Sequence, residues 1–557
     1  MNTLYKPSTF LIAGLIAMAG SAYATQPPDV VTSDANANTA MGSGVLESLT
    51  SGVSNTAAGD GTLEDNTTGS YNTGLGSGVL LYNTSGGSNT AVGYQALQDN
   101  TTGYSNVASG SQALFNNTSG TNNTASGFEA LFYNSTGNNN IAMGYAALAS
   151  NTTGSSNSAS GFEALNSNTT GNNNTASGYQ ALYSNTIGST SAAFGYQALY
   201  SNATGNDNTA LGFQALYSNT TGYQNAASGM FALYSNTTGY NNSASGFDAL
   251  ASNSTGSGNS ASGMYTLTLN TTGYNNTAAG YAALYSNTSG NYNNASGYFA
   301  LHNNSTGAQN SASGVQALYA NKTGNFNTAS GTDALYSSTT GSTNIAAGYK
   351  AGYNLTTGSN NIDIGNQGVA AESGTIRIGT TSTHTATYIA GIYGTSVTGS
   401  AVVVSSTGQL GVTVSSERFK TGITPMDSNS QKLRQLRPVT FHLRSDPSGT
   451  LQYGLIAEEV AKVYPELVIR SESGRIDGVR YDELAPLLLN EVQQQQSKIA
   501  AQMETISTQA AEIRDLKQHQ KQFATQTQLE DLKRELRTAL LKLQSKGGAR
   551  SYALRHS

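Results

Sequence analysis

Glycine, leucine and asparagine recur along most of this chain at one fixed interval. From Gly42 to Gly365 a glycine stands at every seventeenth position, and in nearly every unit a leucine follows it four residues later. An asparagine precedes this glycine by four residues in every unit but one, where Ser191 replaces it. We call these glycines the first register. A second glycine commonly lies ten residues further on, as at Gly222, and we call this set the second register.

A short fixed period predicts a stack of similar coils. Seventeen residues are too few for a pair of helices, so we expect two short strands and two turns in each coil of a β-solenoid or β-roll. Leucine and two alanines per coil would fill a thin core. The first-register glycine would allow a tight corner or a close backbone approach. The Asn-Thr-Thr-Gly stretch would form the other turn, because Asn and Gly tolerate positive φ.

The pattern changes twice after the repeats. Residues 366–414 are rich in Val, Ile, Thr and Gly. Alternating patterns broken by Gly occur at 375–379, 386–391 and 402–411, and they predict short strands in a β-rich neck. Residues 415–486 mix strand and helix patterns and predict a small α/β domain. Over residues 487–545, apolar side chains recur at alternating steps of three and four, which predicts a coiled-coil helix. Its apolar positions are Leu489, Val492, Ile499, Met503, Ile506, Ala510 and Ile513, and later Leu529, Leu532, Leu536, Ala539 and Leu543.

The first residues read as a targeting segment. Lys6 precedes an apolar run from Phe10 to Met18, and the small-residue site Ser21-Ala-Tyr-Ala24 follows. This is the pattern of a secretory signal peptide over residues 1–24, with a linker over 25–37 after it. The apolar run is too short for a membrane span of ~20 residues. We therefore expect an exported chain, at a bacterial cell surface or outside the cell, with no transmembrane segment in its mature form.

Composition and charge exclude several classes of function. The chain of 557 residues has 63 Gly, no Cys and 10% charged residues. Without Cys it has no disulfide scaffold, no Cys-ligated metal and no thiol catalysis. Of its 25 Lys and Arg, 21 lie after residue 414, so the repeats offer no basic surface for nucleic acid. Asp is too scarce in the repeats for calcium-binding coils.

Three kinds of side chain recur at a fixed position in successive units and would form rows, or ladders, along the stack. Each ladder has both a structural and a functional interpretation. Aromatic residues follow the first-register glycine by one position or by five, as in Tyr196 and Tyr200, and would stack on each other or on sugars. The asparagines would bond each other and the backbone, or bind polar ligands. The threonine pairs would serve as turn residues, or as a flat array of the ice-binding type. In each case we favour the structural interpretation.

One short motif carries candidate chemistry. Ser415 lies five residues before Lys420, at the point where the composition changes. Alone, this spacing means little. With Leu436-Arg-Pro-Val-Thr-Phe441, Gly454-Leu-Ile-Ala-Glu-Glu-Val460 and Gly478-Val-Arg-Tyr481, it resembles the intramolecular chaperone and auto-processing domain of phage endosialidases and tail fibres. The repeats loosely resemble the heads of trimeric autotransporter adhesins, which implies a surface fibre.

The resemblance implies a domain that trimerises, assists folding of the upstream fibre and then cuts itself off. Carried over to this chain, Ser415 is the nucleophile, Lys420 is the general base, and the cut lies between Val414 and Ser415. No metal or cofactor is implied. The family usually has Asp after the nucleophile, whereas this chain has Ser416. Two alternatives follow: Ser416 is the functional hydroxyl in a shifted register, or the domain has lost cleavage and kept its chaperone role. We interpret His442 as a structural residue and not as a member of the catalytic site.

The sequence therefore predicts a mainly β chain in seven segments. These are the signal peptide (1–24), a linker (25–37), the solenoid (38–365), the neck (366–414), the chaperone domain (415–486), the coiled coil (487–545) and a tail (546–557). The predicted function is a homotrimeric fibre protein with a single-turnover serine endopeptidase of the Ser–Lys type. The alternatives are an adhesin that binds surface glycans and has a non-cleaving trimerisation domain, and an inert spacer.

Overall fold

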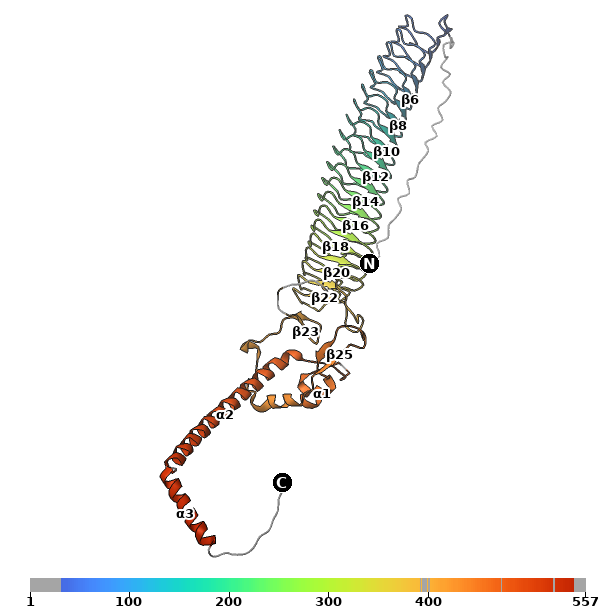
Figure 1. The fold of residues 1–557 in the computed structure, drawn as a ribbon. Coiled ribbons are helices and arrows are strands. Elements are labelled where there is room, and N and C mark those ends of the chain that lie inside the picture. Colours follow the sequence, from blue (N-terminus) through green and yellow to red (C-terminus); the bar gives the residue numbers. More distant parts are fainter. Residues whose placement is uncertain are drawn as a thin grey trace. The chain divides into compact units, whose positions relative to one another are not determined.

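The computed structural model describes residues 32–390, 392, 398, 401–471, 473–523 and 526–544, which form two compact units divided after Ala390. The predicted signal peptide and tail lie outside these residues, as does most of the predicted linker. The first unit is a β-solenoid (Figure 1), and the second is a small region with helices and short hairpins. The predicted mainly β fold with a 17-residue-repeat solenoid is confirmed.

The solenoid carries one long parallel sheet. β1 (Thr32–Ser33) pairs antiparallel with β2, and from β2 to β22 each strand pairs parallel with the next. Residues 17 apart lie side by side, as Ala210 and Ala227 do in β12 and β13. The other strands are β2 (Thr39–Met41), β3 (Thr56–Ala58), β4 (Thr73–Leu75), β5 (Thr90–Val92), β6 (Val107–Ser109), β7 (Thr124–Ser126), β8 (Ile141–Met143), β9 (Ser158–Ser160), β10 (Thr175–Ser177), β11 (Ala192–Phe194), β12 (Thr209–Leu211), β13 (Ala226–Ser228), β14 (Ser243–Ser245), β15 (Ser260–Ser262), β16 (Thr277–Ala279), β17 (Asn294–Ser296), β18 (Ser311–Ser313), β19 (Thr328–Ser330), β20 (Ile345–Ala347), β21 (Ile362–Ile364) and β22 (Ile376–Ile378).

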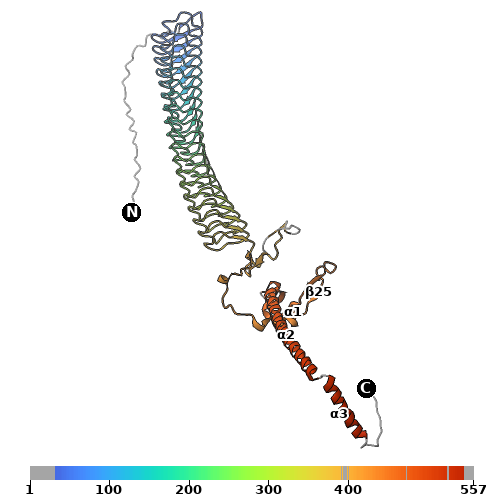
Figure 2. The ribbon, with the colours of Figure 1, turned by 60° about the vertical axis from the view of Figure 1, so that its left-hand side comes forward.

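Each complete coil has one strand, and the prediction of two strands was wrong. The second half of the coil is a chain of turns, in which the core leucine itself has a left-handed backbone, with φ 53° at Leu216. Such a conformation is unfavourable for a residue with a side chain. It persists because the leucine is buried and its N–H donates to the next coil, from Leu216 to the carbonyl of Ala232 at 2.9 Å. Figure 2 shows the coils stacked from end to end.

Leucine and alanine fill the core as predicted. Leu216 and its equivalents in the neighbouring coils are buried, together with the alanine that in most coils precedes the leucine and the alanine in the middle of most strands. Because one coil buries only these three small or medium apolar side chains, its stability depends on the coils on either side.

Two ladders of buried asparagines link each coil to the next by hydrogen bonds. In the first, the Asn225 N–H donates to the side-chain oxygen of Asn208, one coil before, at 3.0 Å. In the second, the side-chain amide of Asn219 donates to Asn202 at 2.7 Å and to the carbonyl of Gly222 at 2.9 Å. Buried amides that are fully bonded stabilise the stack and are not open to ligands. The structural interpretation of the asparagines is confirmed.

Glycine is needed in the two registers for different physical reasons. First-register glycines have positive φ, 138° at Gly212, and a Cβ there would lie 2.6 Å from the Gly229 carbonyl oxygen. The chain bends at the Asn-Thr-Thr-Gly stretch as predicted, but second-register glycines do not have positive φ, so the predicted reason for glycine there was wrong. They are needed because the coils approach closely: a Cβ on Gly222 would lie 2.3 Å from the carbonyl oxygen of Gly239 and 2.4 Å from Asn219 Oδ1.

Replacing Gly222 by Ala is expected to destabilise the solenoid locally by about 3 kcal/mol, because the added methyl group overlaps a backbone carbonyl that cannot move alone. The neighbouring Thr221 is exposed, so Thr221→Ala is the matched control, with an expected change within about 0.5 kcal/mol. Hydrogen exchange of the flanking coils measures both. Equal protection in the two variants would show that the close approach is not needed.

The sheet continues one strand beyond the repeats and ends in a polar cap. Asp363 takes the middle position of β21, where the coil before has Ala346, and its side chain is fully buried. Neither carboxylate oxygen has a hydrogen-bond partner among the described residues. Its partner on β22, Arg377, instead binds Glu372 at 2.7 Å. Burial, followed by the charge of Glu372, raises the pKa of Asp363 to about 6, and Arg377 opposes this rise.

Replacing Asp363 by Asn is expected to slow the hydrogen exchange of β21 and β22 at pH 7.5. At pH 4 the exchange should change little. The pKa of Asp363 in the folded protein lies above the unfolded value of about 4. The stability that the protonated side chain of Asp363 contributes is therefore complete below pH 4 and is lost as the pH rises through about 6. The loss is at most about 3 kcal/mol. Hydrogen exchange of both proteins between pH 4 and 7.5 measures it. Parallel pH profiles for the two proteins would contradict this account of the cap.

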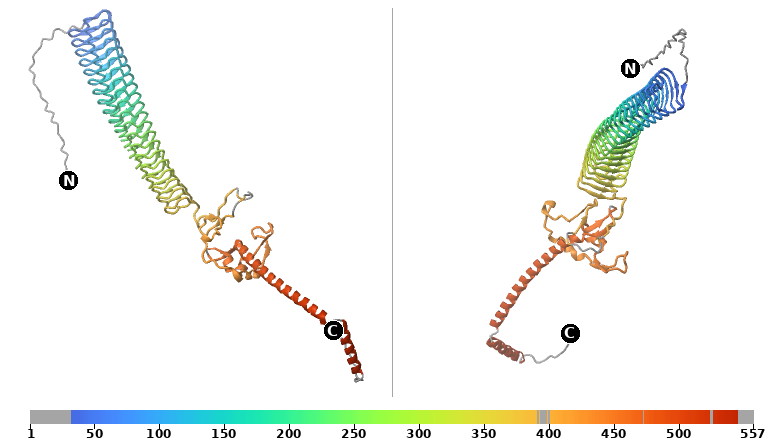
Figure 3. Two further views of the ribbon diagram at one scale, coloured as in Figure 1. Left: turned by 90° about the vertical axis from the view of Figure 1, so that its left-hand side faces the viewer. Right: turned by 90° about the horizontal axis from the view of Figure 1, so that it is seen from above.

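The second unit begins with a hairpin and ends with long helices. No strand forms over residues 386–390, although a short strand was predicted there. The elements are β23 (Val403–Val404), β24 (Leu410–Gly411), η1 (Glu417–Phe419), η2 (Asp427–Gln435), β25 (Val439–Phe441), β26 (Gln452–Gly454), α1 (Ala457–Val463), η3 (Pro465–Leu467), β27 (Val468–Arg470), β28 (Ile476–Val479), α2 (Tyr481–Phe523) and α3 (Gln526–Gln544). Figure 3 shows α2 and α3 as successive helices. Within the described ranges, no helix is both long enough and apolar enough to cross a membrane.

A small core joins α1 to the start of α2. Val460 and Tyr464 pack with Leu467 and Leu487, and all four side chains are buried. Glu491 of α2 is also buried, and it accepts a hydrogen bond from Arg434 of η2 at 2.7 Å. The Arg434 guanidinium lowers the pKa of Glu491. This ion pair fixes the 3-10 helix η2 against the base of α2.

Candidate functional site

The predicted nucleophile and base lie next to each other. The Lys420 ammonium donates to the Ser415 hydroxyl oxygen at 3.3 Å. One turn of 3-10 helix, η1, brings them together: the Phe419 N–H donates to the Ser416 carbonyl at 3.0 Å, and the Lys420 N–H donates to the Glu417 carbonyl at 2.9 Å. The chain therefore turns back over five residues, and Lys420 reaches the residue before the turn. A nucleophile within reach of its base is the geometry that serine catalysis needs.

Ser416 has a different position. It precedes η1 with an extended backbone, and its side chain makes no capping hydrogen bond to the turn. The Lys420 contact is with Ser415, five residues before it. The geometry of the single chain thus favours Ser415 over the shifted register as the nucleophile.

Both members of the pair are exposed in the single chain. A lysine that acts as a base in serine catalysis is removed from water, and one chain alone does not bury Lys420. Apolar side chains around the pair are exposed as well: Val414 at 59%, Phe419 at 55% and Ile423 at 63%. The pair and the apolar side chains next to it in the sequence are therefore all open to solvent in the single chain.

His442 lies outside this pair. Its Nδ1 lies 3.0 Å from the Gly449 carbonyl oxygen, across the loop that connects β25 to β26. A ring N–H donated to this carbonyl would hold the loop. This contact agrees with the structural interpretation of His442.

The predicted aromatic ladders are stacks of rings. In the ladder one position after the first-register glycine, Tyr179 and Tyr196 stack with centroids 5.1 Å apart. In the ladder five positions after it, Tyr200 and Tyr217 are also 5.1 Å apart. Each ring therefore covers the face of the next, and an uninterrupted ladder leaves mainly ring edges to the solvent. Packing along the stack, the interpretation we favoured, is confirmed.

The first residue of the threonine pair in each of these turns also bonds along the stack. The Thr220 hydroxyl donates to the Thr237 carbonyl, one coil further on, at 3.0 Å. A hydroxyl committed to the backbone is not part of a flat ice-like array. This agrees with their interpretation as turn residues.

Sequence reasoning missed two features of the solenoid. One is the buried Asp363, whose only signal was an acidic residue where most strands have Ala. The other is an interruption in a third aromatic ladder, at Ser257 between Tyr240 and Tyr274. The sequence shows Tyr at this position, eleven after the first-register glycine, in three of four successive coils, but the hollow beside Ser257 depends on side-chain positions.

Comparison with known proteins finds one similarity, in the C-terminal region. Residues 415–469 match the family model described as the chaperone of endosialidase, and the match begins at Ser415. A comparison with curated proteins finds no match to this chain. The matched segment runs from the start of η1 into β27 and follows the repeat region.

Proposed function

A chaperone-of-endosialidase domain behind a β-solenoid rod fits a tail-fibre-like protein, and from this premise we propose a self-processing fibre. The chain is exported, assembles as a homotrimer with the help of its C-terminal domain, and then cuts the bond between Val414 and Ser415. The observation that carries this proposal is the 3.3 Å contact between Lys420 and Ser415, at the first residue of the matched segment.

The chemistry needs only this chain and water. Neutral Lys420 accepts the hydroxyl proton of Ser415, and the oxygen attacks the carbonyl carbon of Val414. The bond from that carbon to the Ser415 nitrogen breaks as the nitrogen takes up a proton, which leaves an ester to the Ser415 oxygen. Water then hydrolyses the ester to a Val414 carboxylate and a free Ser415 amine and hydroxyl. Nucleophile and substrate are adjacent in one chain, so each chain reacts once.

The apolar stripe of α2 supports self-association. The stripe consists of Val492, Ile499, Met503, Ile506 and Ile513, and each of these side chains is about half exposed or more. Such a row at heptad spacing is covered when helices of several copies pack together. Side chains of the predicted neck are exposed too, with Ile378 at 69% and Tyr388 at 94%. Assembly of three chains would cover these groups and bury the dyad, which couples cleavage to completed folding.

Export rests on the signal-peptide pattern of residues 1–24, with the rod displayed at the cell surface or released. Denaturing gels of the whole purified product, beside its native mass, test the proposal. The expected result is two fragments from each chain and a trimeric rod. An intact chain that is still trimeric would support the alternative, an adhesin with a permanent trimerisation domain. An intact monomer would contradict both.

A further inference from the structure

A short third ladder of three tyrosines lies in the middle of the solenoid, and one coil within it has Ser in place of Tyr. It lies eleven positions after the first-register glycine and includes Tyr223, Tyr240, Ser257 and Tyr274 in successive coils. Tyr223 and Tyr240 stack with centroids 4.9 Å apart and planes within 1°. Ser257 then takes the place of a ring. The face of Tyr240 that would meet that ring is therefore not covered by a residue of this ladder.

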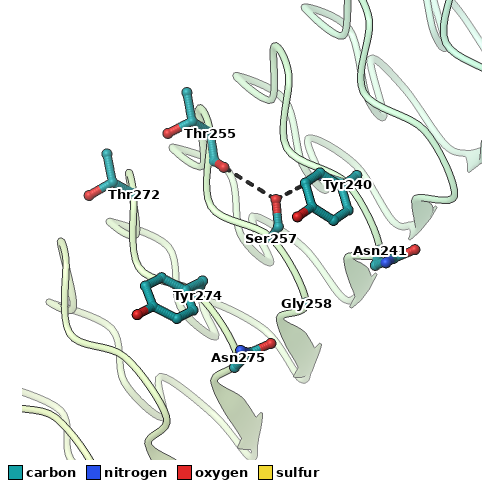
Figure 4. A pocket seen from close by; sticks show the side chains of 8 residues that line it. All are labelled: Tyr240, Asn241, Thr255, Ser257, Gly258, Thr272, Tyr274 and Asn275. Atoms are coloured by element: carbon teal, nitrogen blue, oxygen red, sulfur yellow. Dashed lines mark hydrogen bonds between the residues drawn. The ribbon is translucent and has the colours of Figure 1, made fainter.

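The interruption forms a hollow of about 330 Å³, which we call the tyrosine slot. It is lined by Tyr240, Asn241, Thr255, Ser257, Gly258, Thr272, Tyr274 and Asn275. Figure 4 shows Ser257 and Gly258 in the coil between those of the two tyrosines. Since one coil separates stacked rings by 4.9 Å, two coils separate the slot's walls by about 10 Å. This volume is at the lower end for ligand pockets, roughly 300–1,000 Å³.

The slot is built from small and fixed groups. Gly258 has φ 69°, a backbone conformation that residues with a side chain rarely adopt, and the Asn275 side-chain oxygen lies where a Cβ would stand. Ser257 is held by the Tyr240 N–H at 3.1 Å and donates to the Thr255 carbonyl at 3.3 Å. Other tyrosines support the walls from behind: Tyr223 stacks on Tyr240, and Tyr292 meets Tyr274 edge-on at 5.2 Å.

The edges of the slot are polar and uncharged. The side-chain amides of Asn241 and Asn275 make no hydrogen bond within the described part of the chain, and neither do the hydroxyls of Thr255 and Thr272. None of the eight lining residues carries a charge. The slot therefore offers two aromatic walls, unpaired donors and acceptors around them, and no attraction for an ionic ligand.

We propose that the tyrosine slot binds a neutral pyranose ring. Such a ring between the tyrosines would lie about 5 Å from each centroid, where its C–H groups meet the electron-rich ring faces. Its hydroxyls would reach the free amides and threonine hydroxyls at the edges. The polar edges favour a sugar over an apolar aromatic ligand. This inference goes beyond the self-processing fibre and does not depend on cleavage. Copies of the slot on one fibre would add avidity to a weak single site.

The sharpest test fills the slot without removing a wall. Ser257→Tyr restores the ladder, so its ring should occupy the ligand's place while the coil stays folded. Ser155→Tyr is the matched control, because Ser155 has the same coil position but lies between Asn138 and Asn172. The probes are neutral oligosaccharides ending in glucose, galactose, mannose or their N-acetylamino forms, with sialylated glycans and phenol as comparators.

The full-length protein is expected to bind at least one neutral probe. Ser257→Tyr should weaken that binding by at least about ten-fold, as loss of the stacked contacts predicts, and Ser155→Tyr should leave it unchanged. Tyr274→Ala should also weaken it. Binding of no neutral probe, equal binding by wild type and Ser257→Tyr, or binding of only sialylated glycans or phenol would each overturn the proposal.

Discussion

Replacing Ser415 by Ala is expected to abolish release of the C-terminal fragment completely, because the attacking oxygen is removed. Lys420→Ala should have the same effect at neutral pH, since the hydroxyl then has no base within reach. Lys420→Arg should also stay uncut, because a guanidinium keeps its proton. Gel analysis of freshly purified variants measures the cut fraction.

Ser416→Ala is the control for these variants. It keeps the contact between Lys420 and Ser415 and removes only the neighbouring hydroxyl, so its chains should be cut like the wild type. If the Ser416→Ala chain stayed intact and the Ser415→Ala chain were cut, the nucleophile would be Ser416 and not Ser415. Trimeric assembly should survive in all four variants, since the side chains that they change lie outside the stripe of α2.

A chain with Ile499→Asp and Ile506→Asp is expected to fail both to trimerise and to cut itself. Each isoleucine is more than half exposed in the single chain, and each would be buried in the centre of a three-helix assembly. Burial of an apolar side chain of this size contributes about 1.5–3 kcal/mol, and unpaired carboxylates oppose burial strongly. Sedimentation should therefore show single chains.

The matched control carries the same changes on the opposite side of the helix. Ala501→Asp with Thr508→Asp has the same spacing of seven residues, and both positions are exposed and outside the heptad stripe. This variant should assemble and be cut as the wild type is. Cleavage in a chain that remains monomeric would break the proposed link between assembly and processing.

The repeat allowed the solenoid and its core to be predicted from the sequence. A spacing of 17 places Leu199, Leu216 and Leu233 above one another, and a stack is the arrangement that buries them all. The number of strands did not follow, because the leucine half of the coil has left-handed backbone at Leu216, which is rare for leucine and which propensities do not favour.

The glycines show a similar limit. Sequence reasoning linked Gly222 to positive φ, the commonest reason for glycine in a turn. The actual reason is the carbonyl of Gly239 in the next coil, a contact between residues 17 apart that appears only when the coils are stacked. Asp363 and the tyrosine slot were missed for the same reason, since both depend on what the neighbouring coils place beside them.

The motif around Ser415 was found from its spacing and its context, and the turn η1 supplies the physical reason for that spacing. A 3-10 turn over residues 417–419 brings residue 420 back to residue 415. The sequence of one chain does not determine how the dyad is buried, because the groups that would cover it belong to other copies.

The most direct test of the central claim is the intact mass of the C-terminal fragment released by the wild-type protein. The account predicts a fragment that spans residues 415–557 and begins with a free Ser415 amine, together with a rod that ends at the Val414 carboxylate. A fragment that begins at Ser416 would assign the reaction to the shifted register. A chain that stays whole after it has assembled as a trimer would contradict self-processing.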